Sequence, residues 1–551
     1  MKRTLIISYL AVIAWSQAHA GHAKIARDLQ DRDANARVDV IVQFNSPPTE
    51  AHHQKVRDKG GKHKGTLHVV RGGAYSLPAS ALEALANDPD VEHISPDRPV
   101  YPALDSAEPA VNANIAFQSG YTGKGVTIAV IDSGIMPNND INGRIVYNES
   151  FLINNGNDYF DRYGHGTHVA GIVSGNATDS TGTAYKRTFR GIAPKVQLVN
   201  LRVLDLNGQG TDSGVIAAIQ RAISLKSTYK IKIINLSLGR PVFESYKVDP
   251  LCKAVEAAWK AGIVVVVAAG NYGRDNSAGT DGYGTITAPG NDPYVITVGT
   301  MKDMGTPSRG DDLIASYSSK GPTLIDHIVK PDIVAPGNKI IAAVPAGLGL
   351  TNTYQSNKPL LTYYMVNGNA GSSTAYFTLS GTSMAAPMVS GAAALMLEKE
   401  PSLTPDTVKA RLMKTATKTL PAISIATDPA AGRTYTSYYD LFTVGAGYLD
   451  VWAALNNTDP LPTGKTALSP AAVYNATTGQ VNLVNGTSVV WGTNVVWGTS
   501  VVWGTSVVWG TNVVWGTSGT QGFNVVWGTN VVWGTRQPAG ESTSIAINGE
   551  N

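Results

Sequence analysis

Residues 126–134 have the sequence VTIAVIDSG, in which an apolar run leads directly into Asp132. Short runs of consecutive Val and Ile residues are typical of strands in a parallel sheet that is buried on both faces. Helical patterns separate or follow such runs as far as about residue 455, which predicts an α/β layered fold with a largely parallel sheet. The other strands predicted in this way are 196–203, 231–238, 263–270 and 294–299.

Asp132 is one of three polar residues that stand at predicted strand ends or helix starts. His165, in YGHGTHVAG, opens a helical pattern behind flexible glycines, and Ser383, in GTSMAAP, begins a helix of small residues. Ligands of open α/β sheets bind beyond the carboxyl ends of the strands, so we expect these side chains to meet there. A hydroxyl becomes a nucleophile when an imidazole accepts its proton, and a buried carboxylate fixes the tautomer of that imidazole. The three residues therefore predict a Ser-His-Asp triad.

An oxyanion-binding site is predicted beside Ser383. The N-terminus of a helix directs backbone N–H groups and a partial positive charge toward any anion that forms there. A second donor is needed, and Asn271, at the end of the apolar run in VVVVAAGN, supplies a side-chain amide that can donate to a developing oxyanion.

Seven short blocks follow one another along the chain: IDSGI (131–135), HGTHVAG (165–171), NLSLG (235–239), AAGN (268–271), YSSKGP (317–322), VAPG (334–337) and GTSMAAP (381–387). Together with the Asp, His, Ser order, they resemble the signature blocks of the subtilisin family. The resemblance implies a subtilisin-like three-layer fold with a mainly parallel sheet over residues 106–455, and serine endopeptidase activity on proteins or peptides. It also implies roles for four residues, with no cofactor for the chemistry: Asp132 as orienter, His165 as general base, Ser383 as nucleophile and Asn271 as oxyanion donor.

The same resemblance extends to substrate binding and to calcium. It implies that one strand pairs with an extended substrate backbone and that another segment forms a wall of the primary specificity pocket; these are Ser237, Leu238 and Gly239, and Ala268, Ala269 and Gly270. Small residues leave that pocket open, which favours large apolar side chains. Asp140 falls where a calcium ligand often lies in the family, but the loop 176–189 does not match the remaining ligands cleanly. The long insertion 348–373 is expected to be a surface Ω-loop rather than a border of the cleft.

Two other functions, metal-dependent catalysis and a structural or adhesive role, are alternatives to a serine peptidase. His168 gives an H-x-x-H spacing with His165, but without an HExxH motif or an acidic third ligand this spacing does not indicate metal catalysis. The second alternative is a structural or adhesive exoprotein in which the fold only carries the tail. An inactive carrier is expected to have lost at least one of the four proposed catalytic residues, and all four are present.

The N-terminal residues indicate export and a propeptide. Residues 1–20 combine a charged start, a short apolar run and an A-x-A site, which predicts a signal peptide and a secreted, extracellular protein. Residues 21–105 form a small α+β module that resembles the propeptide of these proteases, an intramolecular chaperone and inhibitor. Its predicted elements are strands at 38–44 and 91–95, a helix at 78–90, and a mobile loop or polar helix at 50–68. Cleavage is expected within 103–112.

The C-terminal part has a different composition. After a linker (456–487), residues 488–535 repeat the hexad [SN]-V-V-W-G-T, and residues 536–551 end the chain. Val-Val-Trp favours strands and Gly-Thr favours turns, so we expect strands of about three residues with a corner in each hexad. A short β-solenoid, a hairpin stack, a surface-attachment patch and a polysaccharide-binding aromatic strip all remain open.

Charge and cysteine content argue against nucleic-acid binding, membrane binding and thiol chemistry. A formal net charge of +3 over 551 residues gives no footprint for nucleic acid and no polybasic membrane patch. The single cysteine, Cys252, lies in a helical pattern and is expected to be a small buried residue rather than a reactive thiol.

Overall fold

The computed structural model describes residues 24–25, 29, 36–68, 71–96, 104–152, 157–428, 432–461, 465–475, 480–484, 492–497, 509–515 and 541–550. Contacts within the chain divide it into two compact units, residues 1–100 and 101–551. The first unit ends a few residues before the predicted module boundary at 105. The predicted signal peptide, 1–20, lies outside the described residues.

The N-terminal unit is a small α+β structure. Its antiparallel sheet has the order β2-β3-β1-β4, with strands β1 (Arg37–Phe44), β2 (Lys62–Leu67), β3 (Gly72–Pro78) and β4 (Val91–Pro96). The inward side chains of β1 alternate with exposed ones, and they pack on Leu82 and Leu85 of helix α3 (Leu82–Ala86) to form a separate core. A 3-10 turn, η3 (Ala79–Ala81), precedes α3, so the predicted helix 78–90 is present but shorter.

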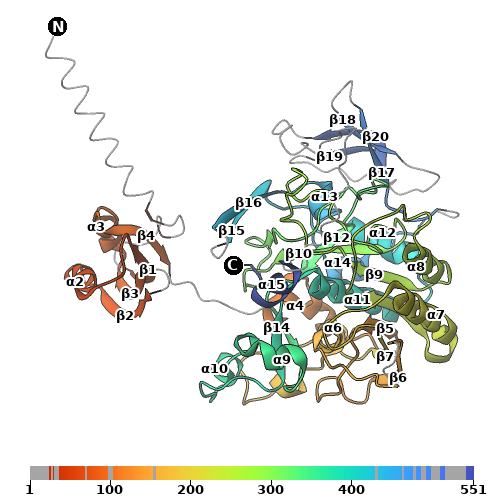
Figure 1. Cartoon of the computed structure of the whole chain (residues 1–551), viewed down its shortest axis with the longest axis horizontal. Helices are drawn as coiled ribbons and strands as arrows, with labels where there is room; N and C mark the ends of the chain where they lie inside the picture. Colours follow the sequence, from red (N-terminus) through yellow and green to blue (C-terminus); the bar gives the residue numbers. More distant parts are fainter. Residues whose placement is uncertain are drawn as a thin grey trace, which may run out of the picture. The chain divides into compact units, whose positions relative to one another are not determined.

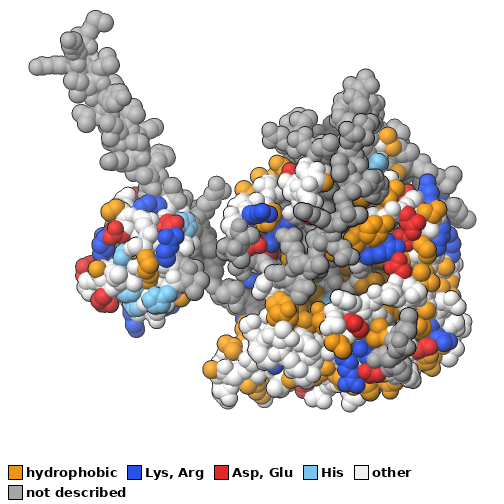
Figure 2. Space-filling model, viewed as in Figure 1, with side chains coloured by type: hydrophobic (Ala, Val, Ile, Leu, Met, Phe, Trp, Pro, Cys, Tyr) orange, Lys and Arg blue, Asp and Glu red, His pale blue; other side chains and the backbone are white. Residues whose placement is uncertain are grey.

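Residues 50–68 are more ordered than the sequence suggests. They form helix α2 (Glu50–Asp58), which agrees with the polar-helix alternative and not with a mobile loop, and strand β2, which neither alternative included. His53 is buried, and its Nδ1 lies 2.7 Å from the hydroxyl of Tyr75. Burial lowers the pKa of His53 from its ordinary value. Other histidine side chains of this unit are visible on its surface in Figure 2.

The second unit is built on one large sheet (Figure 1). Its strand order is β11-β10-β9-β8-β5-β7-β6, with β12 also beside β10, and the pairings are parallel except that between β10 and β11. The five strands expected from the apolar runs are therefore confirmed within a few residues. The strands are β5 (Thr127–Asp132), β6 (Ile145–Ser150), β7 (Gln197–Arg202), β8 (Ile231–Leu236), β9 (Val264–Ala268), β10 (Ile296–Lys302), β11 (Leu313–Ile314) and β12 (Ile333–Pro336).

Two pairs of helices cover the sheet. Helices α6 (His165–Ser174) and α11 (Thr382–Lys399) pack on each other, and α11 also contacts β8, β9 and β10. Helices α7 (Asp212–Tyr229) and α8 (Pro250–Lys260) form the second pair, on β8 and β9. The small residues of α11 permit close approach, since a side chain at Gly391 would collide with Ile192. This three-layer arrangement confirms the predicted fold class.

Shorter elements complete this unit. Helix α4 (Leu104–Ala110) belongs to its core, because Ala107 and Ala110 are fully buried and the hydroxyl of Ser106 donates to Asp303 over 2.8 Å. The others are α5 (Ala113–Gln118), η4 (Thr178–Ser180), β13 (Ile340–Ala343), α9 (Gly349–Thr353), η5 (Gln355–Asn357), α10 (Leu361–Tyr364), β14 (Tyr376–Leu379), α12 (Pro405–Thr415), β15 (Ile423–Asp428), β16 (Arg433–Tyr438), α13 (Leu441–Val444), α14 (Val451–Asn456), β17 (Ala471–Asn475), β18 (Gln480–Val484) and α15 (Glu541–Asn548).

Two strands of the repeat region are described, β19 (Gly492–Trp497) and β20 (Trp509–Trp515). They pair in parallel, with Asn494 opposite Asn512 and Trp497 opposite Trp515. Equivalent residues of hexads three repeats apart therefore lie side by side. Parallel pairing in register is what a solenoid requires, whereas a hairpin stack pairs antiparallel strands. The strands also run through Gly-Thr, so they are longer than the three residues expected.

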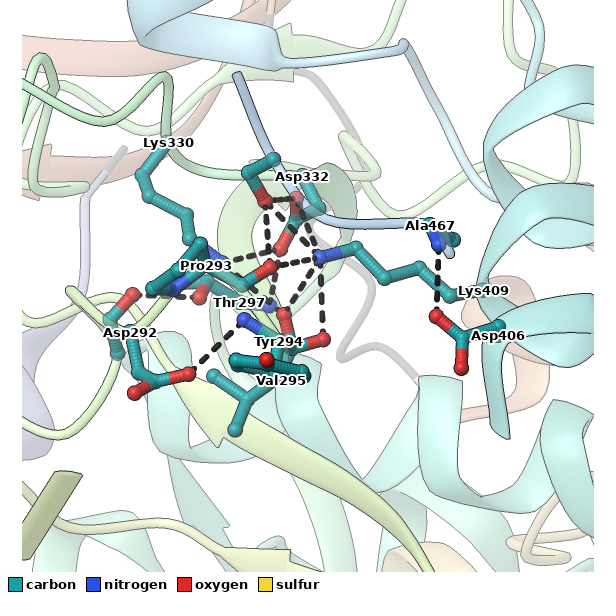
Figure 3. A network of polar contacts seen from close by, with 12 residues as sticks. Asp292, Pro293, Tyr294, Val295, Thr297, Lys330, Asp332, Asp406, Lys409 and Ala467 are labelled. Carbon is teal, nitrogen blue, oxygen red and sulfur yellow. Dashed lines mark hydrogen bonds and ion pairs between the residues drawn. The ribbon is translucent and has the colours of Figure 1, made fainter. Parts of the chain in front are cut away.

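A buried charge network holds the segment 465–475 against this unit (Figure 3). Asp332 pairs with the ammonium groups of Lys330 (2.7 Å) and Lys409 (3.2 Å), and these three side chains are almost completely buried. Lys409 Nζ also donates to the hydroxyl of Ser469 over 2.9 Å and to backbone carbonyl oxygens of residues 293–295. Burial opposes ionisation, but the two ammonium groups hold the pKa of Asp332 below its ordinary value. The network thus fixes the middle of the predicted linker, 456–487, to this unit.

Two smaller expectations can be checked. Cys252 is buried, as predicted, and burial raises the pKa of its thiol. Among the described residues, no helix has both the length and the hydropathy that a membrane span requires.

Lys409→Met should lower the free energy of unfolding by about 3 kcal/mol. The reason is that it removes one of the two cations paired with Asp332 and leaves several buried carbonyl oxygens without a hydrogen-bond donor. Urea unfolding of the protein in a Ser383→Ala background would measure this loss. Lys414→Met on the same helix is the matched control, since its partner Asp459 is half exposed and such surface pairs contribute about 0–1 kcal/mol. Equal losses in the two variants would contradict the role given to the network.

Candidate active site

Three elements bring the predicted triad together at one edge of the sheet. Asp132 is the last residue of β5, His165 the first residue of α6, and Ser383 the second residue of α11. Glycines make the close approach feasible: Gly164 has a φ of 114°, and a side chain at Gly166 would collide with the carbonyl oxygen of Gly134.

Asp132 and His165 are directly hydrogen-bonded. Nδ1 of His165 lies 2.7 Å from Oδ1 of Asp132, whose side chain is fully buried, while the imidazole is 14% exposed. Because a carboxylate only accepts, Nδ1 carries the proton, and Nε2 of the neutral ring is left to accept another. Burial of the imidazole lowers its pKa, but the Asp132 carboxylate, with a smaller contribution from Asp161, outweighs burial and raises the pKa above 6.5.

Asp161 organises the backbone around this pair, and the sequence analysis missed it. Its carboxylate is completely buried and accepts hydrogen bonds from the amides of Gly164 (2.8 Å) and Thr167 (2.9 Å), at the start of α6. It also accepts from the hydroxyl of Ser133 (3.0 Å), which in turn accepts from the amide of Gly166 (2.8 Å). Asp161 thus ties the residue after Asp132 to the first turn of the helix that begins with His165. An acidic residue just before the helix start was the available signal.

The hydroxyl of Ser383 does not donate to His165 in this structure. It donates instead to the carbonyl oxygen of Ser237 over 3.1 Å, and the hydroxyl of Ser237 donates back to the carbonyl oxygen of Ser383 over 2.8 Å. Hydrogen bonds between catalytic groups are often long or misaligned without substrate, so this geometry is compatible with a nucleophile. A rotation about the Cα–Cβ bond of Ser383 redirects the hydroxyl.

Asn271 is held in one orientation by the residue before Ser383. Its Oδ1 accepts hydrogen bonds from the amide (2.9 Å) and the hydroxyl (3.1 Å) of Thr382. Since the carbonyl side of the amide is occupied, Nδ2 remains as the donor toward the cavity that Asn271 lines together with His165 and Ser383. This orientation suits an oxyanion donor.

His165, Asn271 and Ser383 line a cavity of about 540 Å³, together with most of the residues that are expected to bind substrate. Of the six predicted substrate-binding residues, Ser237, Leu238, Gly239, Ala268 and Gly270 line it. Ala269 instead is fully buried, and its backbone is bonded to Val298 and Thr287. The sequence analysis missed the remaining walls: Tyr163, Leu204, Asn207–Asp212, Val215, Arg240, Leu251, Tyr272, Thr287, Ser380, Thr382 and Ala546.

No residue of the insertion 348–373 lines the cavity, which agrees with the expectation that it does not border the cleft, but the insertion contains short helices and packs behind the cavity wall. Backbone amides of Gly349 and Leu350 donate to the carbonyl oxygens of Arg162 and Tyr163, and Leu350 is buried. The insertion therefore supports Tyr163, one of the residues that line the cavity.

The surroundings of Asp140 do not form a calcium-binding donor set in this structure. One carboxylate oxygen accepts from the amide of Asp179 (3.0 Å) and the other from the hydroxyl of Tyr376 (2.8 Å). The neighbouring backbone carbonyl oxygens of Asp140, Ser174 and Pro194 accept from the guanidinium of Arg144. No group of three or more His, Cys, Asp or Glu side chains among the described residues is arranged to hold a metal ion.

His168 has a structural environment. Its Nε2 lies 3.0 Å and 3.1 Å from the carbonyl oxygens of Ile340 and Phe377. Complete burial lowers its pKa to about 3, so the ring stays neutral and fixes β13 and β14 to α6. It faces partners other than those of His165, which gives the H-x-x-H spacing a packing explanation.

Comparisons with known proteins identify the family of this chain. Residues 123–428 match the model of the peptidase S8 family, described as the subtilase family. The chain is 36% identical to serine protease AprX of Bacillus subtilis over 409 residues, covering 72% of this chain and 86% of that protein. It is 33% identical to subtilisin E of Bacillus subtilis over 366 residues, covering 66% and 80%. An extracellular serine proteinase of a Thermus species is also 33% identical, over 63% of this chain and 72% of its own length.

The raised pKa of His165 can be measured directly. We expect its imidazole to titrate above pH 6.5 in histidine-selective NMR spectra, and Asp132→Asn to lower that pKa because the largest favourable charge is removed. His168 is the internal control, since it should not titrate above pH 5 in either protein. A His165 pKa that is unchanged by Asp132→Asn would contradict the pairing.

Proposed function

The chain belongs to the subtilase family and is a subtilisin-like serine protease; on that premise, we propose that it is a secreted endopeptidase that cleaves through a Ser383 acyl-enzyme and is made as an autoprocessed zymogen. The observation that supports this best is the hydrogen-bonded Asp132–His165 pair, whose remaining nitrogen faces the same cavity as Ser383 and Asn271.

Each residue of the site has a role in this mechanism. The Ser383 oxygen attacks the scissile carbonyl carbon while Nε2 of His165 takes the hydroxyl proton, and the Asp132 carboxylate stabilises the imidazolium that forms. The oxyanion accepts from Nδ2 of Asn271 and from the backbone amide at the start of α11. The imidazolium then protonates the leaving amine, and water hydrolyses the acyl-enzyme by the same route in reverse. This chemistry uses no cofactor.

The proposed substrates are extended segments of proteins or peptides. Ser237, Leu238 and Gly239 follow β8 and line the cavity, so they are placed to pair with a substrate backbone. Ala268 and Gly270, with Leu251 and Thr287, leave space for one large side chain. We therefore propose a preference for apolar residues before the scissile bond. Calcium at Asp140 remains a prediction that the protein donors around it do not support.

Maturation is proposed to remove the N-terminal unit. Its separate antiparallel core supports a role as folding template and inhibitor, as the family resemblance implies. Helix α4 is packed in the core of the second unit. Within the expected interval 103–112, we therefore propose that cleavage occurs at the N-terminal end of α4. Secretion is supported by the predicted signal peptide and by the extracellular relative named above.

The repeat region has no role in the proposed cleavage of peptide bonds. Its parallel strands favour a β-solenoid that displays or buries rows of tryptophan, and a surface or polysaccharide partner stays a proposal. The alternative that the protein is an inactive adhesive carrier finds no support in the site, because all four proposed catalytic residues lie together around one cavity or directly behind it.

A covalent serine-hydrolase probe should label the processed protein at Ser383. Ser383→Ala should abolish labelling and should also accumulate unprocessed precursor if the protein cleaves itself. Gel fluorescence and intact-mass spectrometry would measure both outcomes. Absence of label on the correctly folded wild-type protein would overturn the proposed activity, and a normally processed Ser383→Ala variant would overturn autocatalytic maturation alone.

Asn271→Asp should lower kcat by about 100-fold or more with little change in KM, because it removes a hydrogen bond that forms only in the transition state. Aspartate keeps the oxygen that accepts from Thr382, so the backbone before Ser383 retains its anchor. Asn276→Asp is the matched control, since Asn276 is exposed and its side chain bonds only locally, to the amide of Asp281. A similar kcat for the wild type and Asn271→Asp would exclude Asn271 as the oxyanion donor.

A further inference from the structure

The last described residues of the chain return to the catalytic cleft. Residues 541–550, here termed the C-terminal clasp, comprise helix α15 and the two residues after it. Ala546 of the clasp lines the same cavity as His165, Asn271 and Ser383. In Figure 1 the clasp lies beside β14, the strand that leads to Ser383. No motif of the sequence analysis assigns a role to these residues.

Backbone hydrogen bonds fix the clasp to the segment before the nucleophile. The amide of Ser380, three residues before Ser383, donates to the carbonyl oxygen of Ala546 over 2.9 Å. Nδ2 of Asn357 donates to the carbonyl oxygen of Ile547 over 2.5 Å. Asn338 bonds Glu550 twice, accepting from its amide (2.8 Å) and donating to its carbonyl oxygen (2.7 Å). The clasp is therefore bonded at three positions between Ala546 and Glu550 rather than at one point.

Glu550 anchors the clasp electrostatically. Its side chain is 1% exposed and lies 2.6 Å from Lys302 Nζ and 2.8 Å from Arg274 Nη2, both nearly buried themselves. The amide and the hydroxyl of Ser316 also donate to this carboxylate. Burial opposes ionisation, but Lys302, Ser316 and Arg274 together hold the pKa of Glu550 below its ordinary value. Lys302 ends β10 and Arg274 follows Asn271 by three residues, so the anchor sits at the same sheet edge as the proposed active site.

The seat of the clasp is also shaped for it. Ile545 is buried against Ala315 and Tyr317 in a cluster of its own. Gly549 has a φ of 61°, and a side chain there would collide with the hydroxyl of Ser380. The clasp is thus held by an apolar cluster, by a glycine that permits close approach and by a buried ion pair. These features together indicate a specific, stable contact.

We propose that the C-terminal clasp is a specificity-determining wall of the cleft, which limits the length of substrate accepted on the leaving-group side of the scissile bond. If the acyl part of a substrate pairs with Ser237–Gly239, the leaving part must pass the other wall near Ser383, and that wall consists of Ser380, Thr382 and Ala546. The Ser380 amide donates to Ala546 and is therefore not available to pair with a substrate chain. This inference rests on the proposed function.

Substrates of two lengths test the proposal on the mature full-length enzyme. One carries a p-nitroanilide as leaving group, and the other continues for four residues beyond the same scissile bond. Ala546→Phe should reduce kcat/KM for the long substrate by about 10-fold more than for the short substrate, equivalent to about 1.4 kcal/mol of additional steric cost. Ala422→Phe, the same change at an exposed position outside the cavity, should leave both unchanged.

A second variant should change the ratio of long- to short-substrate kcat/KM in the opposite direction, which a general loss of folded enzyme would not do. Glu550→Gln removes the anion between Lys302 and Arg274, so the clasp should loosen and the ratio of long- to short-substrate kcat/KM should rise by about 3-fold or more. Intact-mass spectrometry would establish that the mature enzyme retains residue 550. Equal effects on both substrates, no effect in either variant, or loss of the clasp during maturation would overturn the inference. Failure of the wild type to cleave the short substrate would instead overturn the proposed function.

Discussion

The parallel sheet buried on both faces is the constraint on which the rest of this protein depends. Because the parallel strands point the same way, the residues at or just beyond the carboxyl ends of β5, β8 and β9 meet at one edge, and these residues include Asp132, Ser237 and Asn271. Helices must cover both faces, and two of them, α6 and α11, begin at that same edge. The position of His165 and Ser383 is thus a consequence of covering the sheet.

Buried carboxylates recur wherever separate segments must be held in register. Asp161 joins the residue after Asp132 to the start of α6, Asp332 holds the segment 465–475, and Glu550 holds the clasp. An isolated buried charge is costly, so each of these groups is surrounded by donors or cations from different parts of the chain. The segments 465–475 and 541–550, which lie before and after the repeats in the sequence, are consequently fixed to the same unit.

Much of the candidate site could be predicted because it occupies short blocks with a local signal. A strand pattern ending in Asp132 and helix starts at His165 and Ser383 are local features, and the structure brings these residues together. Thr287 carries no such signal, because its importance comes from which side chains surround it, and the local signal of Asp161, an acidic residue just before a helix start, does not reveal which amides it accepts from. Ala269 shows the converse: its neighbours line the cavity, but the alternation of a backbone leaving a strand turns it away.

The sequence by itself determined the α/β class, the five central strands and the residues at their ends, since apolar periodicity and strand propensity are properties of neighbouring residues. Only the tertiary structure decided that residues 50–68 contain a strand, whose formation depends on pairing with Gly72–Pro78. It alone also placed Ala546 in the wall of the cavity that contains Ser383, and Glu550 between Lys302 and Arg274. Contacts between segments so distant along the chain depend on the shape and charge of a folded surface, and no local pattern encodes them.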